Sequence, residues 1–275
     1  MSENHPRPEL APNVGPPSSG AVTVERTGAI VTVRLSHPGK LNAISVAMWR
    51  ELGLRFAALA EDFTVRGVLI CGAGNDFAAG ADIGEFPVER GDLESVIRYH
   101  EEILAPALRA VAECPHPTVA AIAGVCVGGG LEIACQCDLR IATTSARLGV
   151  PIGQLGFPMA PEEFRGLLAV AGRSLTLELL LEGRILLAPD ALAKGLLTRV
   201  VADDALDAAI GDCFQQILKG SPEAARHNKA TLRRLMPATE PWTPEERRAF
   251  YASWSDSPGH REGVRAFLEK RSPNF

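Results

Sequence analysis

Apolar and polar residues alternate in the first structured part of the chain, beyond about residue 20. The segments 21–26 and 29–36 both follow this period of two, and a Thr27-Gly28 pair separates them. Alternation of this kind around a glycine predicts a hairpin of half-buried strands. From Ser45 the period becomes that of an amphipathic helix, whose apolar face carries Val46, Trp49, Leu52, Phe56 and Leu59.

Short apolar runs then alternate with helical segments up to about residue 150. A long helix is expected over 92–113, with a kink at Pro106. Beyond Pro161 the pattern is nearly all helical. The expected strands cover 67–72, 118–124, 138–144 and 147–150, and the expected helix breaks fall at Gly172, Gly183, Gly195, Gly220 and Pro237. This order favours an α/β fold with a parallel-sheet core and a helical C-terminal part.

Length and composition place the chain among ordinary globular proteins of one or two domains. It has 275 residues, of which 46% are hydrophobic and 22% charged. The net charge of −5 argues against binding to nucleic acid or to an anionic membrane surface. No apolar run reaches the roughly 18 residues of a membrane span. We expect a disordered arm over 1–20, an α/β core over 21–200 and a helical region over 201–275.

The cysteines and the N-terminus indicate a reducing compartment. Five of the six cysteines lie in or beside apolar stretches and lack the spacing of a disulfide framework or a zinc site. The proline- and glycine-rich N-terminus lacks the apolar core of a signal peptide. The expected location is therefore cytoplasmic.

Two glycine-rich corners each follow a buried apolar strand. The first spans 78–82, and the second runs from Gly124 to Glu132. Small residues there leave backbone amides open to a ligand, and in the second corner the glycines open a helix at the positive end of its dipole. Two such amides converging on one oxygen would polarise a carbonyl, and Glu132 could move a proton. The alternative is tight packing at the glycines, with Glu132 merely complementing the helix dipole.

Other chemistry-bearing motifs are missing from the sequence. It has no dinucleotide fingerprint, no phosphate-binding Gly-Lys-Ser/Thr loop and no Gly-x-Ser-x-Gly nucleophile elbow. The six histidines lack metal-ligand spacing, so no metal site is expected. His100 is expected to face solvent or to be satisfied internally rather than to act as a ligand.

The order of the motifs resembles the enoyl-CoA hydratase/isomerase (crotonase) family from about Val22 to the C-terminus. The resemblance rests on the segments 37–43, 77–83, 124–132, 137–138, 181–184, 193–196 and 261–271. It implies a crotonase-type spiral of ββα units with a helical C-terminal trimerisation region, in a homotrimer or a homohexamer. It also implies an acyl-CoA thioester as substrate, with coenzyme A as part of that substrate and no separate cofactor.

By position in the family motifs, the amides of Ala81 and Gly129 would form the oxyanion hole, and Glu132 would handle the proton. Lys270 would attract a phosphate of coenzyme A, unless it is simply solvated. The other substrate-binding positions that the resemblance implies are Lys40, Leu41, Ala43, Ala79, Asp82, Ile83, Gly128, Ile152 and Phe267.

The chain departs from the family pattern at the second catalytic acid. Hydratases of this family carry a second glutamate about twenty residues after the first, and that position is Ile152 here. Some relatives place an acid about eight residues further on, where this chain has Ala160. Glu162 and Glu163 are the nearest acids. They either complement the dipole of a helix that begins after Pro161 or supply the missing acid, and Glu162 is the candidate for that catalytic role.

The expected activity is that of an acyl-CoA-processing enzyme, with hydration of a 2-enoyl-CoA (a lyase reaction) as the default. Because of Ile152, isomerisation, decarboxylation and thioester hydrolysis remain open, as does an acyl-CoA binding protein without catalysis. The bulky segment 157–161 is expected to reshape the acyl pocket.

Overall fold

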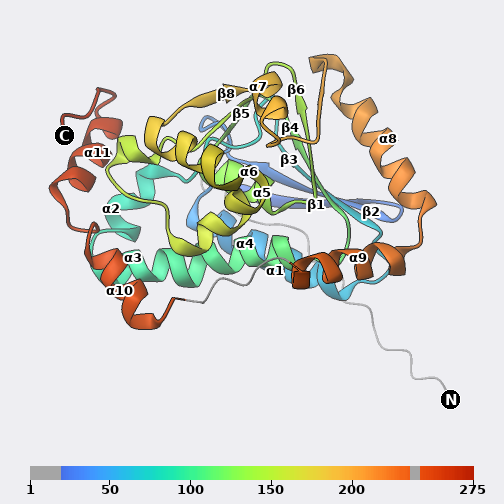
Figure 1. The fold of residues 1–275 in the computed structure, drawn as a ribbon, viewed down its shortest axis with the longest axis horizontal. Coiled ribbons are helices and arrows are strands. Elements are labelled where there is room, and N and C mark those ends of the chain that lie inside the picture. The colour runs from blue at the N-terminus through green and yellow to red at the C-terminus, as the bar shows by residue number, and fades with distance from the viewer. Residues whose placement is uncertain (1–19, 236–241) are drawn as a thin grey trace.

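The computed structural model describes residues 20–235 and 242–275. A six-stranded sheet in the order β1-β2-β3-β4-β6-β9 forms its centre (Figure 1). β1 and β2 pair antiparallel, and every later neighbour pairs parallel. The strands are β1 (Ala21–Thr27), β2 (Ile30–Ser36), β3 (Gly67–Gly72), β4 (Thr118–Ile122), β6 (Leu139–Thr143) and β9 (Arg199–Val201).

A second, three-stranded sheet lies beside the first. It consists of β5 (Val125–Val127), β7 (Arg147–Gly149) and β8 (Ile185–Leu187), with β5 parallel to β7 and β8 antiparallel to it. β4 and β5, and then β6 and β7, are successive strands that enter the two sheets in turn, and each pair is followed by a helix. This is the repeated ββα connection that the family resemblance implies.

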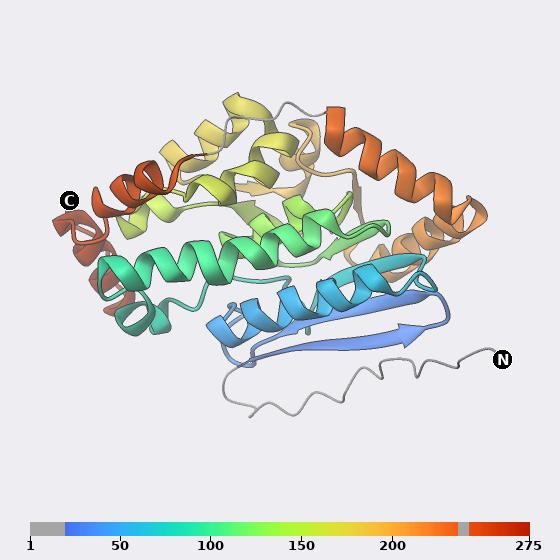
Figure 2. The same ribbon diagram turned by 90° about the horizontal axis from the view of Figure 1, so that it is seen from below.

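Helices cover both faces of the large sheet. α1 and α4 pack against each other under one face, and Ile210, Cys213 and Phe214 of α8 pack against apolar residues of β4 and β6 on the other (Figures 1 and 2). The helices are α1 (Val46–Glu61), α2 (Phe86–Glu89), α3 (Leu93–Ile97), α4 (Ala105–Glu113), α5 (Gly129–Gln136), α6 (Pro161–Glu182), α7 (Ala188–Ala193), α8 (Leu206–Lys219), α9 (Pro222–Leu235), α10 (Pro244–Ala252) and α11 (Pro258–Leu268). Shorter 3-10 turns are η1 (Ile83–Glu85), η3 (Ile152–Leu155) and η4 (Asp203–Ala205).

The local sequence signals account for most of these elements. The hairpin forms around Thr27 and Gly28, as expected. Ser45 caps α1 by accepting a hydrogen bond from the Met48 N–H, and the predicted apolar face of α1 is buried. Gly172 interrupts α6 with a φ of 64°, and Gly183 ends it in the left-handed region.

The structure differs from the expectation in two places. The strands β8 and β9 fall within the region expected to be helical. The helix expected to kink at Pro106 instead contains a π-helical segment just before that proline, η2 (Arg98–Leu104), which joins α3 to α4. The expected arm over 1–20 and the break at Pro237 lie, apart from residue 20, outside the described residues.

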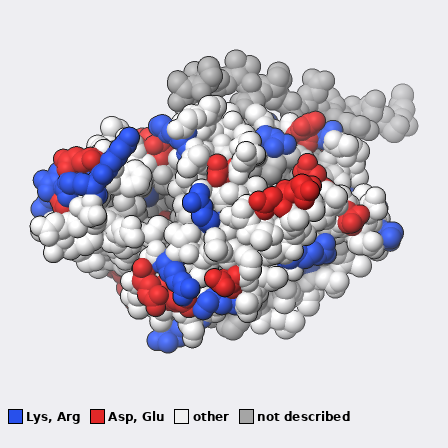
Figure 3. Space-filling view, turned by 90° about the horizontal axis from the view of Figure 1, so that it is seen from above, with Lys and Arg blue, Asp and Glu red and all other residues white. Residues whose placement is uncertain are grey.

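The C-terminal helices separate to opposite ends of the molecule. α8 and α9 lie at one end, whereas α10 packs against α3 and α11 packs against η1 and η3 at the other (Figure 2). None of the helices in the part of the chain that the structure describes is both long and apolar enough to cross a membrane. On the face shown in Figure 3, basic and acidic side chains are interspersed.

Candidate active site

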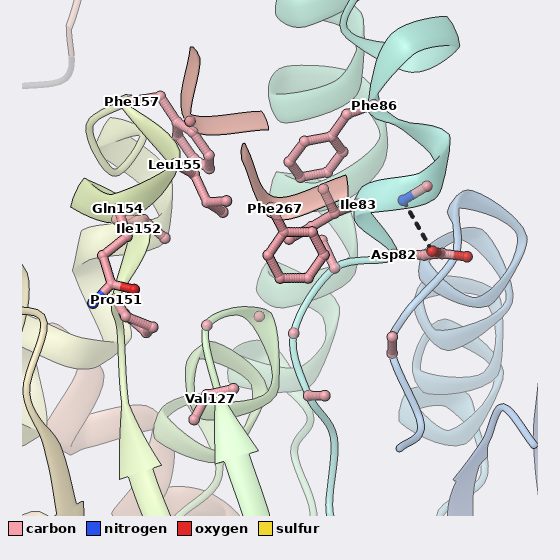
Figure 4. A pocket seen from close by; sticks show the side chains of 18 of the residues that line it. Asp82, Ile83, Phe86, Val127, Pro151, Ile152, Gln154, Leu155, Phe157 and Phe267 are labelled. Atoms are coloured by element: carbon pink, nitrogen blue, oxygen red, sulfur yellow. Dashed lines mark hydrogen bonds between the residues drawn. The ribbon is translucent and has the colours of Figure 1, made fainter. Parts of the chain in front are cut away.

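A cavity of about 800 Å³ lies where the two glycine corners meet η3, α6 and the end of α11. Figure 4 shows Ile83 and Phe86 on one side of it, Ile152, Leu155 and Phe157 on the other, and Phe267 between them. Every substrate-binding position implied by the family resemblance lines this cavity. The lining also includes Ala81, Gly129, Glu132, Arg90, Leu104 and Glu163.

The first glycine corner presents the Ala81 amide to the cavity. The Gly80 carbonyl accepts a hydrogen bond from the Ile44 N–H (2.7 Å), and the Asp82 N–H donates to the Ile44 carbonyl (2.9 Å). Because the C=O and N–H of a trans peptide point in opposite directions, the Ala81 N–H points away from Ile44. Among residues 20–235 and 242–275, it has no backbone acceptor.

The second corner presents the Gly129 amide at the start of α5. The Gly128 carbonyl accepts from the Glu132 N–H (2.9 Å), so the Gly129 N–H of the same peptide points out of the helix N-terminus. A β-carbon on Gly129 would lie 3.6 Å from the Ala81 nitrogen and 2.8 Å from Cζ2 of Trp49. The two amides are therefore neighbours, and only glycine fits at 129.

Glu132 stands in the first turn of α5 and is 5% exposed. No side-chain or backbone group of the described residues donates a hydrogen bond to its carboxylate. Burial raises the pKa of Glu132 well above its ordinary value, and the nearby carboxylate of Glu163 raises it further, whereas Arg90 acts in the opposite direction. A buried carboxyl group with a raised pKa suits proton transfer near neutral pH.

Glu163, rather than Glu162, is the acid of α6 that lines the cavity. Its Oε1 lies 2.5 Å from Nδ1 of His100, and its Oε2 accepts a hydrogen bond from the Ala160 N–H (3.2 Å). Burial lowers the pKa of His100 against the opposing effect of Glu163, and Nε2 of His100 has no partner among the described residues. A neutral His100 that donates from Nδ1 fits both observations. His100 is thus buried and bonded internally through Nδ1, which excludes the solvent-facing alternative.

Glu162 points elsewhere. It accepts hydrogen bonds from Arg165 (2.9 and 3.2 Å) and lies 3.7 Å from both Arg109 and Arg247. It is not among the cavity-lining residues. The two acids are consecutive on a helix, so their side chains diverge by about 100° around its axis. Glu163 therefore points into the cavity, whereas Glu162 does not.

The loop at the cavity entrance is held in an uncommon conformation. Leu41 and Asn42 have φ values of 48° and 57°. The buried Asn42 side chain anchors the loop by donating to the carbonyls of Ala73 and Asp76 and accepting from the His37 N–H. Leu41 is left 54% exposed at the entrance.

Cationic side chains surround the same entrance. Lys40 forms an ion pair with Asp82 (2.6 Å), and Lys270 follows α11 with a φ of 55°. Arg271 is paired with Glu262 and Glu269. Phe267 of α11 is 54% exposed and lies over the cavity (Figure 4). The C-terminal segment therefore covers the cavity with one aromatic ring and basic groups.

The inner end of the cavity is apolar and aromatic. Ile152, where the family resemblance implies a second glutamate, lines the cavity without a proton-transferring group. Phe157 is stacked on Trp254 with a centroid distance of 5.4 Å, and its ring meets that of Phe86 edge-on at 6.2 Å. The expected bulky wall is present. Phe86, Leu104 and Arg90 join it from segments without a sequence signal.

Comparisons with known proteins identify the family and the fold of this chain. The family model for enoyl-CoA hydratase/isomerase matches residues 25–275. A probable enoyl-CoA hydratase of Mycobacterium tuberculosis is 32% identical over 256 residues, which cover 92% of this chain and 97% of that protein.

Two solved structures are similar over nearly the whole chain. A crystal structure of an enoyl-CoA hydratase/carnithine racemase from Magnetospirillum magneticum has a TM-score of 0.77 and 41% identity, covering 94% of this chain and 97% of that one. A methylmalonyl-CoA decarboxylase in complex with 2-nitronate-propionyl-CoA has a TM-score of 0.80 and 27% identity, covering 92% and 97%.

Proposed function

This chain belongs to the enoyl-CoA hydratase/isomerase family, and from that premise we propose that it polarises the thioester carbonyl of an acyl-CoA between the amides of Ala81 and Gly129 and uses Glu132 to transfer the proton. The family resemblance and the crotonase fold expected from the motifs are confirmed. The observation that carries the mechanism is the convergence of these two amides in one cavity with a carboxyl group whose pKa is raised.

The proposed reaction is hydration of a 2-enoyl-CoA through an enolate. Donation from two amides withdraws electron density from the thioester carbonyl and makes the β-carbon electrophilic. The oxygen of water bonds to the β-carbon, one water proton passes to a carboxylate, and a proton is delivered to the α-carbon. The enolate oxygen carries negative charge only between these steps, which is when the amides bind it most strongly.

Glu163 is proposed to replace the acid that is missing at Ile152. It lines the cavity, and it acts on the pKa of Glu132 through its charge. His100 and the Ala160 amide hold both of its oxygens, so its carboxylate is fixed in place.

A second candidate is a shift of the double bond between the α,β and β,γ positions. Both oxygens of Glu163 are engaged, whereas Glu132 has no hydrogen-bond donor among the described residues. One free carboxylate suffices for such a shift, because it removes a proton from one carbon and returns it to another.

The remaining parts of the proposal concern the substrate's coenzyme A and the assembly. Leu41 and the backbone of 79–83 would contact its adenine and pantetheine, and Lys40 and Lys270 its phosphates; no other cofactor is needed. We further propose a homotrimer or homohexamer in the cytoplasm. Exposed apolar side chains such as Leu181 and Leu187 support association, and the buried free thiols of Cys126 and Cys135 support a reducing compartment.

The test follows loss of the enoyl-thioester absorbance of crotonyl-CoA with the wild type, Glu132→Gln and Glu182→Gln. Glu182 is an exposed acid at the far end of α6 and controls for the substitution itself. We expect turnover by the wild type and Glu182→Gln, and a loss of about 10²- to 10⁴-fold in Glu132→Gln. Equal rates for wild type and Glu132→Gln would refute the role of Glu132.

A parallel measurement separates the candidates. Exchange of the α-protons of butyryl-CoA in D₂O reports enolate formation whatever the net reaction. Exchange with hydration supports the hydratase, and exchange with conversion of a 3-enoyl-CoA but no hydration supports the isomerase. Binding of butyryl-CoA without exchange or turnover would identify a binding protein and refute the proposed catalysis.

A further inference from the structure

Arg90 is a buried cation in the wall of the active-site cavity. It follows α2 and is only 6% exposed, although its guanidinium carries a permanent charge. Its central carbon lies 3.7 Å from the ring centroid of Phe86, 4.2 Å from that of Tyr99 and 4.9 Å from that of Phe157. The three rings partly compensate the charge and hold the guanidinium in one place.

The hydrogen-bonding capacity of this guanidinium is largely unused. Within residues 20–235 and 242–275, its Nε and Nη1 are buried without a hydrogen-bond partner, and no carboxylate lies within ion-pair distance of it. Nearly all buried polar groups are paired, and a buried charge without a partner is costly. Arg90 therefore lacks a carboxylate in ion-pair contact among the described residues, although its charge lowers the pKa of Glu132.

The location of Arg90 indicates which part of a ligand would meet it. Arg90 lines the same cavity as Ala81, Gly129 and Glu132. Phe86 and Phe157, which contact its guanidinium, belong to an apolar cluster that Ala81 and Ile152 join. A ligand whose thioester carbonyl sits at the two amides would thus direct its acyl chain along Ile152 toward the aromatic wall and Arg90. The phosphates of coenzyme A would lie at the entrance, beside Lys40 and Lys270.

From these observations, and resting on the proposed function, we propose that Arg90 binds a distal carboxylate on the acyl chain, so that the preferred substrates are acyl-CoA thioesters of dicarboxylic acids. A carboxylate matches the planar fork of a guanidinium, and an otherwise apolar wall strengthens a charge-assisted pair by excluding water. Glu132 and Glu163 do not take this role, because neither is in ion-pair contact with Arg90.

The test measures binding rather than turnover. Freshly prepared succinyl-, glutaryl- and adipoyl-CoA are each compared by calorimetry with the analogue whose distal carboxylate is a neutral carboxamide. The saturated chains cannot be hydrated, and the two members of a pair have nearly the same shape. We expect at least one acid to bind the wild type about 10- to 100-fold more tightly than its carboxamide.

Variants assign the preference to Arg90. Arg90→Met keeps an apolar stem and should abolish the preference by weakening binding of the acid more than binding of its carboxamide, and Arg90→Lys should retain part of the preference. Arg98→Met removes an exposed guanidinium that pairs with Glu89 and should keep the full preference. The wild-type comparison stands even if an Arg90 variant fails to fold.

Three results would overturn the proposal. If the wild type binds each acid and its carboxamide with affinities within about twofold of each other, Arg90 has a structural role only, and the proposed function is unaffected. If Arg90→Met keeps the preference, a group other than Arg90 binds the carboxylate. If neither acids nor carboxamides bind, the proposed acyl-CoA function itself fails and this inference fails with it.

Discussion

A single methyl group at Gly129 tests the proposed oxyanion hole with the smallest available change. The β-carbon of Gly129→Ala would lie 2.8 Å from Cζ2 and 3.3 Å from Cη2 of Trp49. Carbon atoms pack best at about 3.5–4.0 Å, so the overlap is roughly 0.7–1.2 Å. Trp49 is fully buried in the main core and has no free space to enter. The start of α5 must therefore move relative to Ala81.

The expected loss follows from this displacement. Removing one donor from an oxyanion hole lowers kcat by about 10²- to 10³-fold, and overpacking a core costs about 1–3 kcal/mol. We expect both effects in Gly129→Ala, with little change in KM because the entrance proposed to bind coenzyme A is untouched. Gly211→Ala is the matched control: its β-carbon meets nothing within 4 Å on α8. It should keep full activity and gain up to about 1 kcal/mol.

The assay combines initial rates, or α-proton exchange of butyryl-CoA, with urea unfolding of the wild type and both variants. A Gly129→Ala protein that is folded and retains wild-type kcat would refute the assignment of this amide. Equal losses in Gly129→Ala and Gly211→Ala would show that the effect is not local to the site.

Three further predictions concern the charged groups of the site. Because the pKa of Glu132 is raised, the folded protein holds this proton more tightly than the unfolded chain; the resulting stability is present below the ordinary value of 4.5 and is lost as pH rises through the folded value. Glu132→Gln should therefore raise Tm relative to wild type more at alkaline than at acidic pH, and a pH-independent difference would contradict this. Glu163→Gln removes a charge that raises the pKa of Glu132, so the acidic limb of the kcat profile should move to lower pH; an upward shift would argue against the coupling. Lys270→Ala should raise KM about two- to fivefold at low ionic strength and much less at ~1 M salt, whereas a salt-independent effect would exclude a phosphate contact.

The elements predicted from the sequence are those whose signal is local. The hairpin at 21–36 and the α1 helix follow from a period and a cap, and Gly172 and Gly183 interrupt or end α6 through their own φ angles. The strands β8 and β9 have only three residues each and exist because β7 and β6 pair with them. Three residues carry no usable period, so tertiary pairing decides their structure.

The candidate active-site positions also fall into two groups, those with a local sequence signal and those fixed by tertiary contacts. The glycine corners place Ala81, Gly129 and Glu132 by motif, and the structure brings all three to one cavity. The choice between Glu162 and Glu163 depends on helix phase and on His100, which lies 63 residues earlier in the chain. No local sequence pattern predicts the contact between His100 and Glu163.

Arg90 shows more clearly what the sequence alone cannot predict. It is an isolated arginine after a four-residue helix, and the sequence around it resembles a solvated turn. Its burial arises from Phe86, Tyr99 and Phe157, which approach from three different segments. Only the assembled fold shows that its charge faces the cavity.

The most direct test of the two-amide carbonyl site is isotope-edited infrared spectroscopy of a bound acyl-CoA whose thioester carbonyl carries ¹³C. If the amides of Ala81 and Gly129 both donate to this oxygen, its stretching band should move to lower frequency on binding, and the shift should shrink in Gly129→Ala. A band at the frequency of the free thioester, with binding intact, would contradict the mechanism.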